Sequence, residues 1–361
     1  EAQKNIATAN QSLQQQVRKY QQLPKAHIGM VKSAYATGNT QLTKMADKVN
    51  QLSGTFQILP DFLGSDQPRT YALMAMTTSE ERSSGGLIGS VGVVTTDNGK
   101  IGIGDFRSNG EYIPYGAGDP TEDEQRIFRQ WGPLNMSFDV RDLAVYPDTS
   151  RSAEGMRAIW QRTPWGSNTQ LDGVLMVDPV FLQELTKISG NVTIPDGTVL
   201  TGDNTAEFLL NKVYVDYPVS MQDTLFAQVA EQTVGSMFSN VDLAKLTKVA
   251  QLMGSMAEGR HFSMYAFDET AEKTISDAGF TAQTPSSEEH PQVGVYVTEQ
   301  NPSKMGWYIH RTSKVTRSTC GNDGSQTYHV EYKMTNTLES SQIGALTSYI
   351  LGSGGQGVEK L

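Results

Sequence analysis

Cysteine and long apolar stretches are nearly missing from this 361-residue chain. Cys320 is its single cysteine, so no disulfide can form within the chain. It lies beside an expected turn and has no neighbouring base, which argues against a cysteine nucleophile. No run of about 18 apolar residues occurs, so we expect no membrane-spanning helix within these residues.

The signatures of several common enzyme classes are missing as well. The five histidines form neither His-x-x-x-His nor Glu-x-x-His spacing, which argues against a zinc hydrolase. No Gly-x-Ser-x-Gly elbow, Walker A loop or Gly-x-Gly-x-x-Gly between a strand and a helix occurs. Serine hydrolases with a nucleophile elbow, P-loop enzymes and dinucleotide-binding enzymes are therefore disfavoured.

Charge is unevenly distributed along the chain. The formal net charge of −10 argues against nucleic acid as a partner. Residues 1–60 carry seven lysines and arginines against two acids, a net charge of +5, so the rest carries −15. A basic leading arm suits an anionic membrane surface, although solvated lysines on an ordinary helix give the same pattern.

Apolar periodicity divides the chain into three parts. Residues 1–60 show helical spacing with breaks at Pro24 and at Gly38-Asn39, which predicts a helical stalk or hairpin of short helices. A local helical subdomain packed on the core is the alternative. Residues 61–283 alternate strand and helix patterns, which predicts an α/β core. Residues 284–361 predict a β-rich C-terminal region, truncated at Leu361 because no closing strand is evident.

Charged residues and glycines follow the first strong strand of the core, Tyr71–Met76. Glu80 and Arg82 are predicted in a polar turn, and Gly85 and Gly86 come next, before a second strand. Strand ends beside glycines often present binding groups on a rigid sheet. A simple strand–turn–strand with solvated charges is the alternative interpretation.

A third strand is followed by Asp105 and Arg107. If the strand ends converge, Arg82 and Arg107 would clamp a phosphate or pyrophosphate, and Glu80 or Asp105 would hold Mg²⁺. Local salt bridges, Glu80 with Arg82 and Asp105 with Arg107, are the alternative. Asp148 precedes an expected helix and serves either as its N-cap or as a general base.

Several segments together resemble the bacterial domain of unknown function 4012 family. They are TTSEERSSGGLIGS, YPDTSRSAEGM, LDGVLMVDPVFLQELTKISGNVTI, GRHFSMYAFDETAEKTISDAGF and NPSKMGWYIHRTSKV. The resemblance runs in order over about residues 1–350, and Thr77, Thr78, Thr149 and Ser150 depart from the family pattern. It implies an envelope protein with a stalk and a membrane anchor. The anchor would lie upstream of Glu1, where the chain lacks an initiating Met.

A more distant similarity links the core to the LytR-CpsA-Psr transferases. Their Gly-Ser-Asp-x-Arg falls on Ser79–Arg82, and the arginine of their Ile-Pro-Arg-Asp falls on Arg107. The similarity implies a central mixed sheet with helices on both faces, and strand-end residues that grip a polyprenyl pyrophosphate. The Arg-x-Arg of those enzymes is replaced by Lys212-Val-Tyr214, which puts transferase activity in doubt.

We therefore expect an extracytoplasmic, membrane-anchored protein of the cell envelope. It would bind a phosphorylated, polyprenyl-linked glycan and, as a phosphotransferase, transfer it to the cell wall. The catalytic candidates are Arg82, Arg107 and Asp148. A non-catalytic envelope scaffold is the second hypothesis, and a cytoplasmic small-molecule enzyme is the third.

Overall fold

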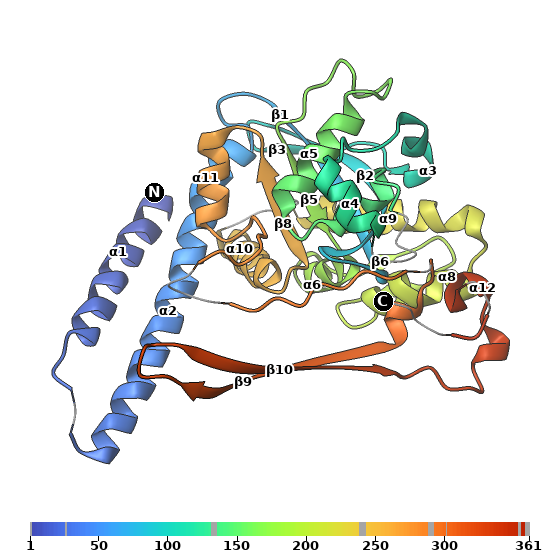
Figure 1. Cartoon of the computed structure of the whole chain (residues 1–361). Helices are drawn as coiled ribbons and strands as arrows, with labels where there is room; N and C mark the ends of the chain where they lie inside the picture. Colours follow the sequence, from blue (N-terminus) through green and yellow to red (C-terminus); the bar gives the residue numbers. More distant parts are fainter. Residues whose placement is uncertain are drawn as a thin grey trace.

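A six-stranded mixed sheet forms the centre of the molecule, as predicted for the core (Figure 1). The computed structural model describes residues 2–25, 27–130, 136–237, 243–287, 292–300, 302–352 and 355–357. The strand order is β3-β2-β1-β5-β8, and β4 pairs with β2. The strands are β1 (Arg69–Arg82), β2 (Gly85–Asp97), β3 (Lys100–Ile103), β4 (Arg107–Ser108), β5 (Gly173–Val177) and β8 (Phe262–Ala266).

The sheet is mixed because β1 runs antiparallel to β2 and parallel to β5, whereas β5 runs antiparallel to β8. β2 and β3 are joined by Asn98 and Gly99, whose φ angles are 48° and 80°. Two positive φ angles in an Asn-Gly pair match the tight hairpin turn that this dipeptide favours. β5 is buried throughout, as expected for a parallel strand that is covered on both faces.

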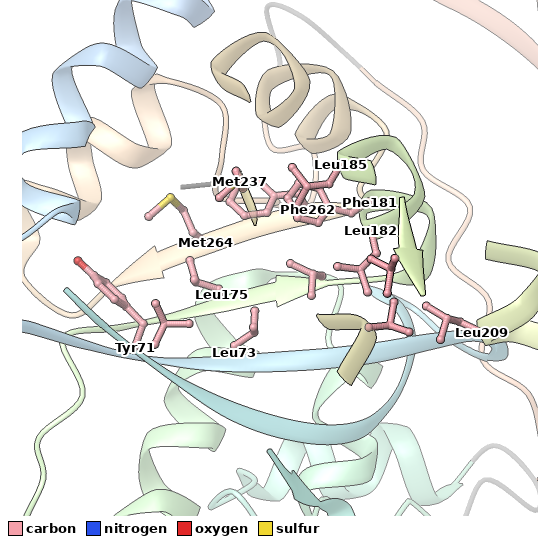
Figure 2. Close-up of a cluster of buried hydrophobic side chains, with 14 of the residues drawn as sticks. Tyr71, Leu73, Leu175, Phe181, Leu182, Leu185, Leu209, Met237, Phe262 and Met264 are labelled. Carbon is pink, nitrogen blue, oxygen red and sulfur yellow. The ribbon is translucent and has the colours of Figure 1, made fainter. Parts of the chain in front are cut away.

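Alternate side chains of the sheet enter two separate cores, because the strand pleat points neighbours to opposite faces. On one face Leu73, Leu175 and Met264 pack against helices (Figure 2). These helices are α2 (Gly29–Phe62), α6 (Pro179–Ser189), α9 (Val219–Met237) and α10 (Leu243–Glu258). On the other face Met74 and Met176 pack against α5 (Thr149–Trp160) and the 3₁₀ helix η2 (Val140–Val145).

The remaining short elements lie between these layers and around the sheet edges. They are α3 (Asn109–Tyr112), η1 (Ile113–Tyr115), α4 (Glu122–Gln130), β6 (Val192–Thr193), β7 (Val199–Leu200), α7 (Thr205–Glu207), the π-helical turn η3 (Phe208–Lys212), α8 (Val213–Asp216), α11 (Glu269–Asp277), η4 (Met305–Tyr308), η5 (Ile343–Ala345) and α12 (Ser348–Leu351).

The N-terminal residues form a helical hairpin beside the core, α1 (Ala2–Gln21) against α2 (Figure 1). The predicted break at Gly38-Asn39 is wrong, because α2 continues unbroken through both residues. A side chain at Gly38 would overlap the phenol of Tyr20 on α1. The glycine therefore allows close helix packing instead of ending a helix. The rings of Tyr20 and Tyr35 stack 4.9 Å apart at this crossing.

The C-terminal region contains a long antiparallel hairpin, β9 (Ile309–Cys320) and β10 (Gln326–Asn336). The turn expected beside Cys320 is present at Gly321–Gly324. The hairpin projects along one side of the core, and nearly all of its side chains are exposed (Figure 1). The predicted domain boundaries at residues 60 and 283 stay predictions. None of the helices in the described part of the chain is long and apolar enough to cross a membrane.

Candidate functional site

The end of β1 is buried and continues further than the sequence pattern predicts. Glu80, Glu81 and Arg82 belong to the strand itself, and the turn to β2 is made by Ser83 and Ser84. The three charged residues are 5%, 1% and 8% exposed. The interpretation of solvated turn charges is therefore wrong, and each charge needs a partner inside the protein.

The partners come largely from one distant segment of the chain. Lys304 Nζ lies 3.2 Å from the carboxylate of Glu80, and Arg311 Nη1 lies 2.7 Å from that of Glu81. Glu299 accepts a hydrogen bond from Arg82 at 3.5 Å, and its backbone N–H donates to the carbonyl of Glu81 at 3.1 Å. Glu299, Lys304 and Arg311 thus lie across the strand end and pair with its charges.

Arg82 is also held by a residue of η2, the 3₁₀ helix that packs on the α5 face of the sheet. Its Nε donates to Asp142 at 3.1 Å, and its Nη1 donates to the carbonyl of Glu81 at 2.8 Å. Asp142 in turn accepts from the backbone and hydroxyl of Ser137 at 2.9 and 2.8 Å. A buried guanidinium that is satisfied on several sides is held rigidly, as a binding group requires.

A cavity of about 640 Å³, here called the head pocket, opens beside this strand end. Its charged walls combine three cations with four carboxylates. The cations are Arg82, Arg141 and Lys304, and the carboxylates are Glu80, Asp142, Asp178 and Glu299. Asn109, Ser137 and Gln222 add polar groups to the lining. The pocket can therefore bind anionic oxygens through the cations and hydroxyl groups through the carboxylates.

Lys304 is the deepest of these cations. It is 2% exposed and lies 4.3 Å from the centre of the Tyr214 ring. Burial opposes its charge, but Tyr214 and Glu80 outweigh that effect and hold the pKa of Lys304 above its ordinary value. Lys304 therefore stays charged at neutral pH.

A second, apolar cavity of about 90 Å³, here called the tail cavity, adjoins the head pocket. The two share five wall residues from the sheet, the β3–β4 connection, α6 and α9, which are Ala75, Phe106, Val177, Leu182 and Ala230. The tail cavity lies within the core of Figure 2, between the sheet and helices α2, α6, α9 and α10. The site therefore changes from polar to apolar along its depth.

Arg107 and Asp105 do not reach the head pocket. They line a separate groove with Glu111, and Arg107 bonds that carboxylate at 2.9 Å. Arg107 also lies over the Trp165 ring, 4.3 Å from its centre. The expected convergence with Arg82 is therefore not observed, and the expected local pair between Arg107 and Asp105 is not observed either.

Sheet register explains this separation. β4 pairs with β2 at Ser90 and Val91, and Ser90 lies opposite Ala75 of β1. Ala75 precedes Arg82 by seven residues, which corresponds to about 23 Å at about 3.3 Å per residue. The pair expected to hold Mg²⁺, Glu80 and Asp105, is separated in the same way. No group of three acidic, histidine or cysteine side chains in the described ranges is arranged to hold a metal ion.

Asp148 and the glycine pair have structural tasks. Asp148 stands at the N-cap position of α5, but its carboxylate accepts hydrogen bonds from the backbone and hydroxyl of Thr284 instead of capping the helix. Gly85 has a φ of +139°, and a side chain at Gly86 would overlap the carbonyl of Thr77. Both glycines are therefore required by the β1–β2 hairpin. Asp148 does not line the head pocket, the tail cavity, the groove of Arg107 or a third cavity beside Arg82. Gly85 lines that third cavity.

A third cavity of about 400 Å³, here called the side pocket, lies on the other side of Arg82 and Asp178. His261 lines it, and its Nδ1 lies 2.6 Å from Asp178 Oδ2. The hydrogen bond to Asp178 raises the pKa of His261. Sequence reasoning missed this pair because 83 residues separate its members, and only the role of Asp178 as a helix start is visible locally.

Sequence reasoning also missed Arg141 and Lys304, which complete the head pocket. Arg141 is part of the η2 turn, and Lys304 belongs to the C-terminal region. Arg141 lies outside the family-like segments, and Lys304 lies within NPSKMGWYIHRTSKV but was given no role there. A buried lysine in particular leaves no local signature, because its burial depends on the distant Glu80 and Tyr214.

Comparisons with known proteins find a family match over part of the chain and leave the activity open. No curated protein matches the chain. A solved structure, the transcriptional regulator yvhJ from Bacillus subtilis, is similar over 74% of this chain and 90% of its own, with 12% identity and a TM-score of 0.27. That likeness is too weak to carry an argument. Residues 66–214 match the sequence model of the protein family of unknown function DUF4012, so this segment is similar to that family.

Proposed function

We propose that this protein binds a phosphorylated, polyprenyl-linked glycan in the cell envelope and transfers the glycan to the cell wall. The observation that carries the proposal is the joining of a charged pocket to an apolar cavity through five shared wall residues. An amphiphile with a phosphate-bearing polar head and a hydrocarbon tail matches such a site in both halves. A membrane-anchored, extracytoplasmic location is part of the proposal.

The head pocket matches a phosphorylated sugar better than a bare phosphate. Three cations alone would suit a simple anion, but four carboxylates share the lining. Carboxylates accept hydrogen bonds from sugar hydroxyls, and guanidinium groups bind phosphate oxygens in a bidentate manner. Arg141 is the most available cation, because its side chain is 39% exposed and pairs with Asp139 at the pocket rim.

The proposal does not depend on a metal. Glu80 is engaged by Lys304, and Asp105 faces a different groove, so the two do not form one Mg²⁺ site. Arg141 is the head-pocket cation whose side chain is exposed enough to meet a phosphate. Arg107 is left with no role at the head, since it lies in the groove with Glu111.

The tail cavity would take only the first carbons of a lipid chain. Its volume of about 90 Å³ equals that of about three water molecules in the liquid. A longer chain would continue between α9 and α10, whose apolar side chains Val234 and Val249 line the cavity. Each buried CH₂ would add about 0.8 kcal/mol to binding.

A binding assay with two variants and two matched controls tests both halves of the site. The probe is a fluorescent short-chain polyprenyl pyrophosphate. Arg141→Ala removes a head cation, and Arg126→Ala removes an exposed arginine paired with Asp123 on α4. Ala230→Phe fills the shared wall, and Ala227→Phe places the same ring one turn earlier on α9, in the groove of Arg107.

We expect binding to weaken at least tenfold in Arg141→Ala and Ala230→Phe, with both controls close to the parent. Inorganic pyrophosphate should distinguish the two variants, because only Arg141→Ala removes a cation from the head pocket. Equal affinities in all five proteins would refute the proposal. Mass spectrometry of lipids extracted with protein from native membranes then identifies the natural ligand.

The C-terminal hairpin favours a second candidate function, a scaffold that binds other envelope proteins. β9 and β10 form a two-stranded sheet whose exposed side chains include Val315, Tyr328 and Val330. An isolated two-stranded ribbon is marginally stable in water, so a partner would stabilise it. Absence of bound lipid in the parent, with a protein cross-linked to the hairpin, would favour this candidate.

A further inference from the structure

The side pocket contains an imidazole–carboxylate pair that the proposed binding site does not use. Asp178 is 2% exposed, and its two carboxylate oxygens interact with different groups. Oδ1 accepts the backbone N–H of Phe181 at 2.9 Å and caps α6, while Oδ2 lies 2.6 Å from His261 Nδ1. A carboxylate fixed in this way holds the imidazole in one orientation and one tautomer.

The second ring nitrogen of His261, a residue that lines the side pocket, is free to accept a proton. With Nδ1–H donated to Asp178, Nε2 carries the lone pair of the neutral ring. Within the described ranges no protein group bonds Nε2, although the side chain is only 34% exposed. A helix cap needs only the carboxylate, so the histidine is not explained by capping alone.

The pair lies between the side pocket and the head pocket. Arg82 and Asp178 line both cavities, whereas His261 lines only the side pocket. Hydroxyl and cationic groups dominate the polar lining of the side pocket. They are Thr78, Ser79, Ser83, Ser84, Tyr332, Arg260 and Arg311. This lining suits a polyhydroxylated, anionic molecule, such as a wall glycan.

We propose that the side pocket binds the acceptor glycan and that His261 is the general base of the transfer. This inference rests on the proposed function. An acceptor hydroxyl oxygen attacks the glycan-side phosphorus of the lipid pyrophosphate held in the head pocket. The new O–P bond forms while the bridging P–O bond breaks, and the polyprenyl phosphate leaves with the electron pair. The hydroxyl proton passes to His261 Nε2.

Asp178 is a positioning residue in this step, because it acts through His261. Its negative charge stabilises the imidazolium that forms when the proton arrives. Several charged or titratable groups surround the ring and set its titration. They are Asp178 and Glu184, which favour protonation, and Arg82, Arg260, Arg311 and Tyr332 in the pocket lining. Transfer should therefore rise with pH as the imidazole loses its proton, at a pKa above the ordinary value of about 6.5.

The test measures lipid binding and transfer separately in the full chain. The donor is a short-chain polyprenyl pyrophosphoryl N-acetylglucosamine, the acceptor is chitotetraose, and release of polyprenyl phosphate is the readout. We expect His261→Gln to bind the donor like the parent and to transfer at least about 100-fold more slowly, as loss of a general base predicts. The rise with pH should disappear. His329→Gln, on the exposed face of β10, is the matched control.

Asp178→Asn keeps a capping oxygen for α6 but removes the charge. It should transfer slowly and lower the pKa of His261, which NMR titration of the imidazole measures without any ligand. Normal transfer by His261→Gln, or a parent that binds the donor without transfer, overturns the role of His261 and leaves lipid binding standing. A parent that binds no donor overturns the proposed function and this inference with it.

Discussion

Replacing Lys304 by methionine should reveal how much the C-terminal segment contributes to the stability of the core. The ammonium group lies 3.2 Å from Glu80, and both side chains are almost fully buried. Methionine has a similar length and keeps packing against Tyr214 and Tyr349, whose rings lie 4.3 and 5.3 Å from Nζ. The substitution therefore removes the charge and leaves most of the volume.

The cost follows from the partner that remains. Glu80 would be buried without a counter-ion, and breaking a buried pair in this way costs about 3–5 kcal/mol. For a chain of this size each kcal/mol lowers Tm by about 2 °C, so we expect a decrease of about 6–10 °C. Glu80→Gln in the same protein removes the stranded charge and should restore more than half of the loss.

Differential scanning calorimetry and urea unfolding measure the effect. Lys273→Met is the matched control, because its ion pair with Asp277 is 75% and 67% exposed. An exposed pair contributes at most about 1 kcal/mol, so the control should change little. Hydrogen exchange in residues 302–311 reports whether the segment detaches before the core unfolds. A loss below 1 kcal/mol in Lys304→Met would refute the reasoning.

Three further outcomes follow from the geometry. Gly86→Ala should lower the free energy of unfolding by about 2–4 kcal/mol, because the new methyl group overlaps a carbonyl of the facing strand, and denaturant unfolding checks this. Asp178 raises the pKa of His261, so protonation of the imidazole stabilises the folded state. This stabilisation is fully present below about pH 6.5 and is lost as pH rises through the pKa of the folded state. The urea midpoint should therefore fall with rising pH in the parent and stay constant in His261→Gln. Gly38→Ala should push Tyr20 away and loosen α1 without affecting the core, which limited proteolysis detects as earlier cleavage of the N-terminal helix.

Several helices and strands could be predicted from the sequence, because the residues that determine them are neighbours in the chain. The strand at Tyr71–Met76 and the break between the N-terminal helices at Pro24 depend on neighbours a few residues away. The sequence pattern singled out the strand end that carries Glu80 and Arg82, and in the structure these two residues line a cavity. The extent of the strand was not predicted, since nothing local shows that charged residues continue a strand when distant counter-ions cover them.

Tertiary structure alone decided which charges meet. Arg82 and Glu299 are 217 residues apart, and His261 and Asp178 are 83 apart, so neither pair follows from periodicity or spacing. The register of the sheet places Arg107 far from Arg82. Gly38 does not end a helix, because it allows close packing against Tyr20. The sequence by itself determined where the main helices and strands form. The pairing of charges and the joining of the head pocket to the tail cavity depend on chain crossings, which local free energies do not encode.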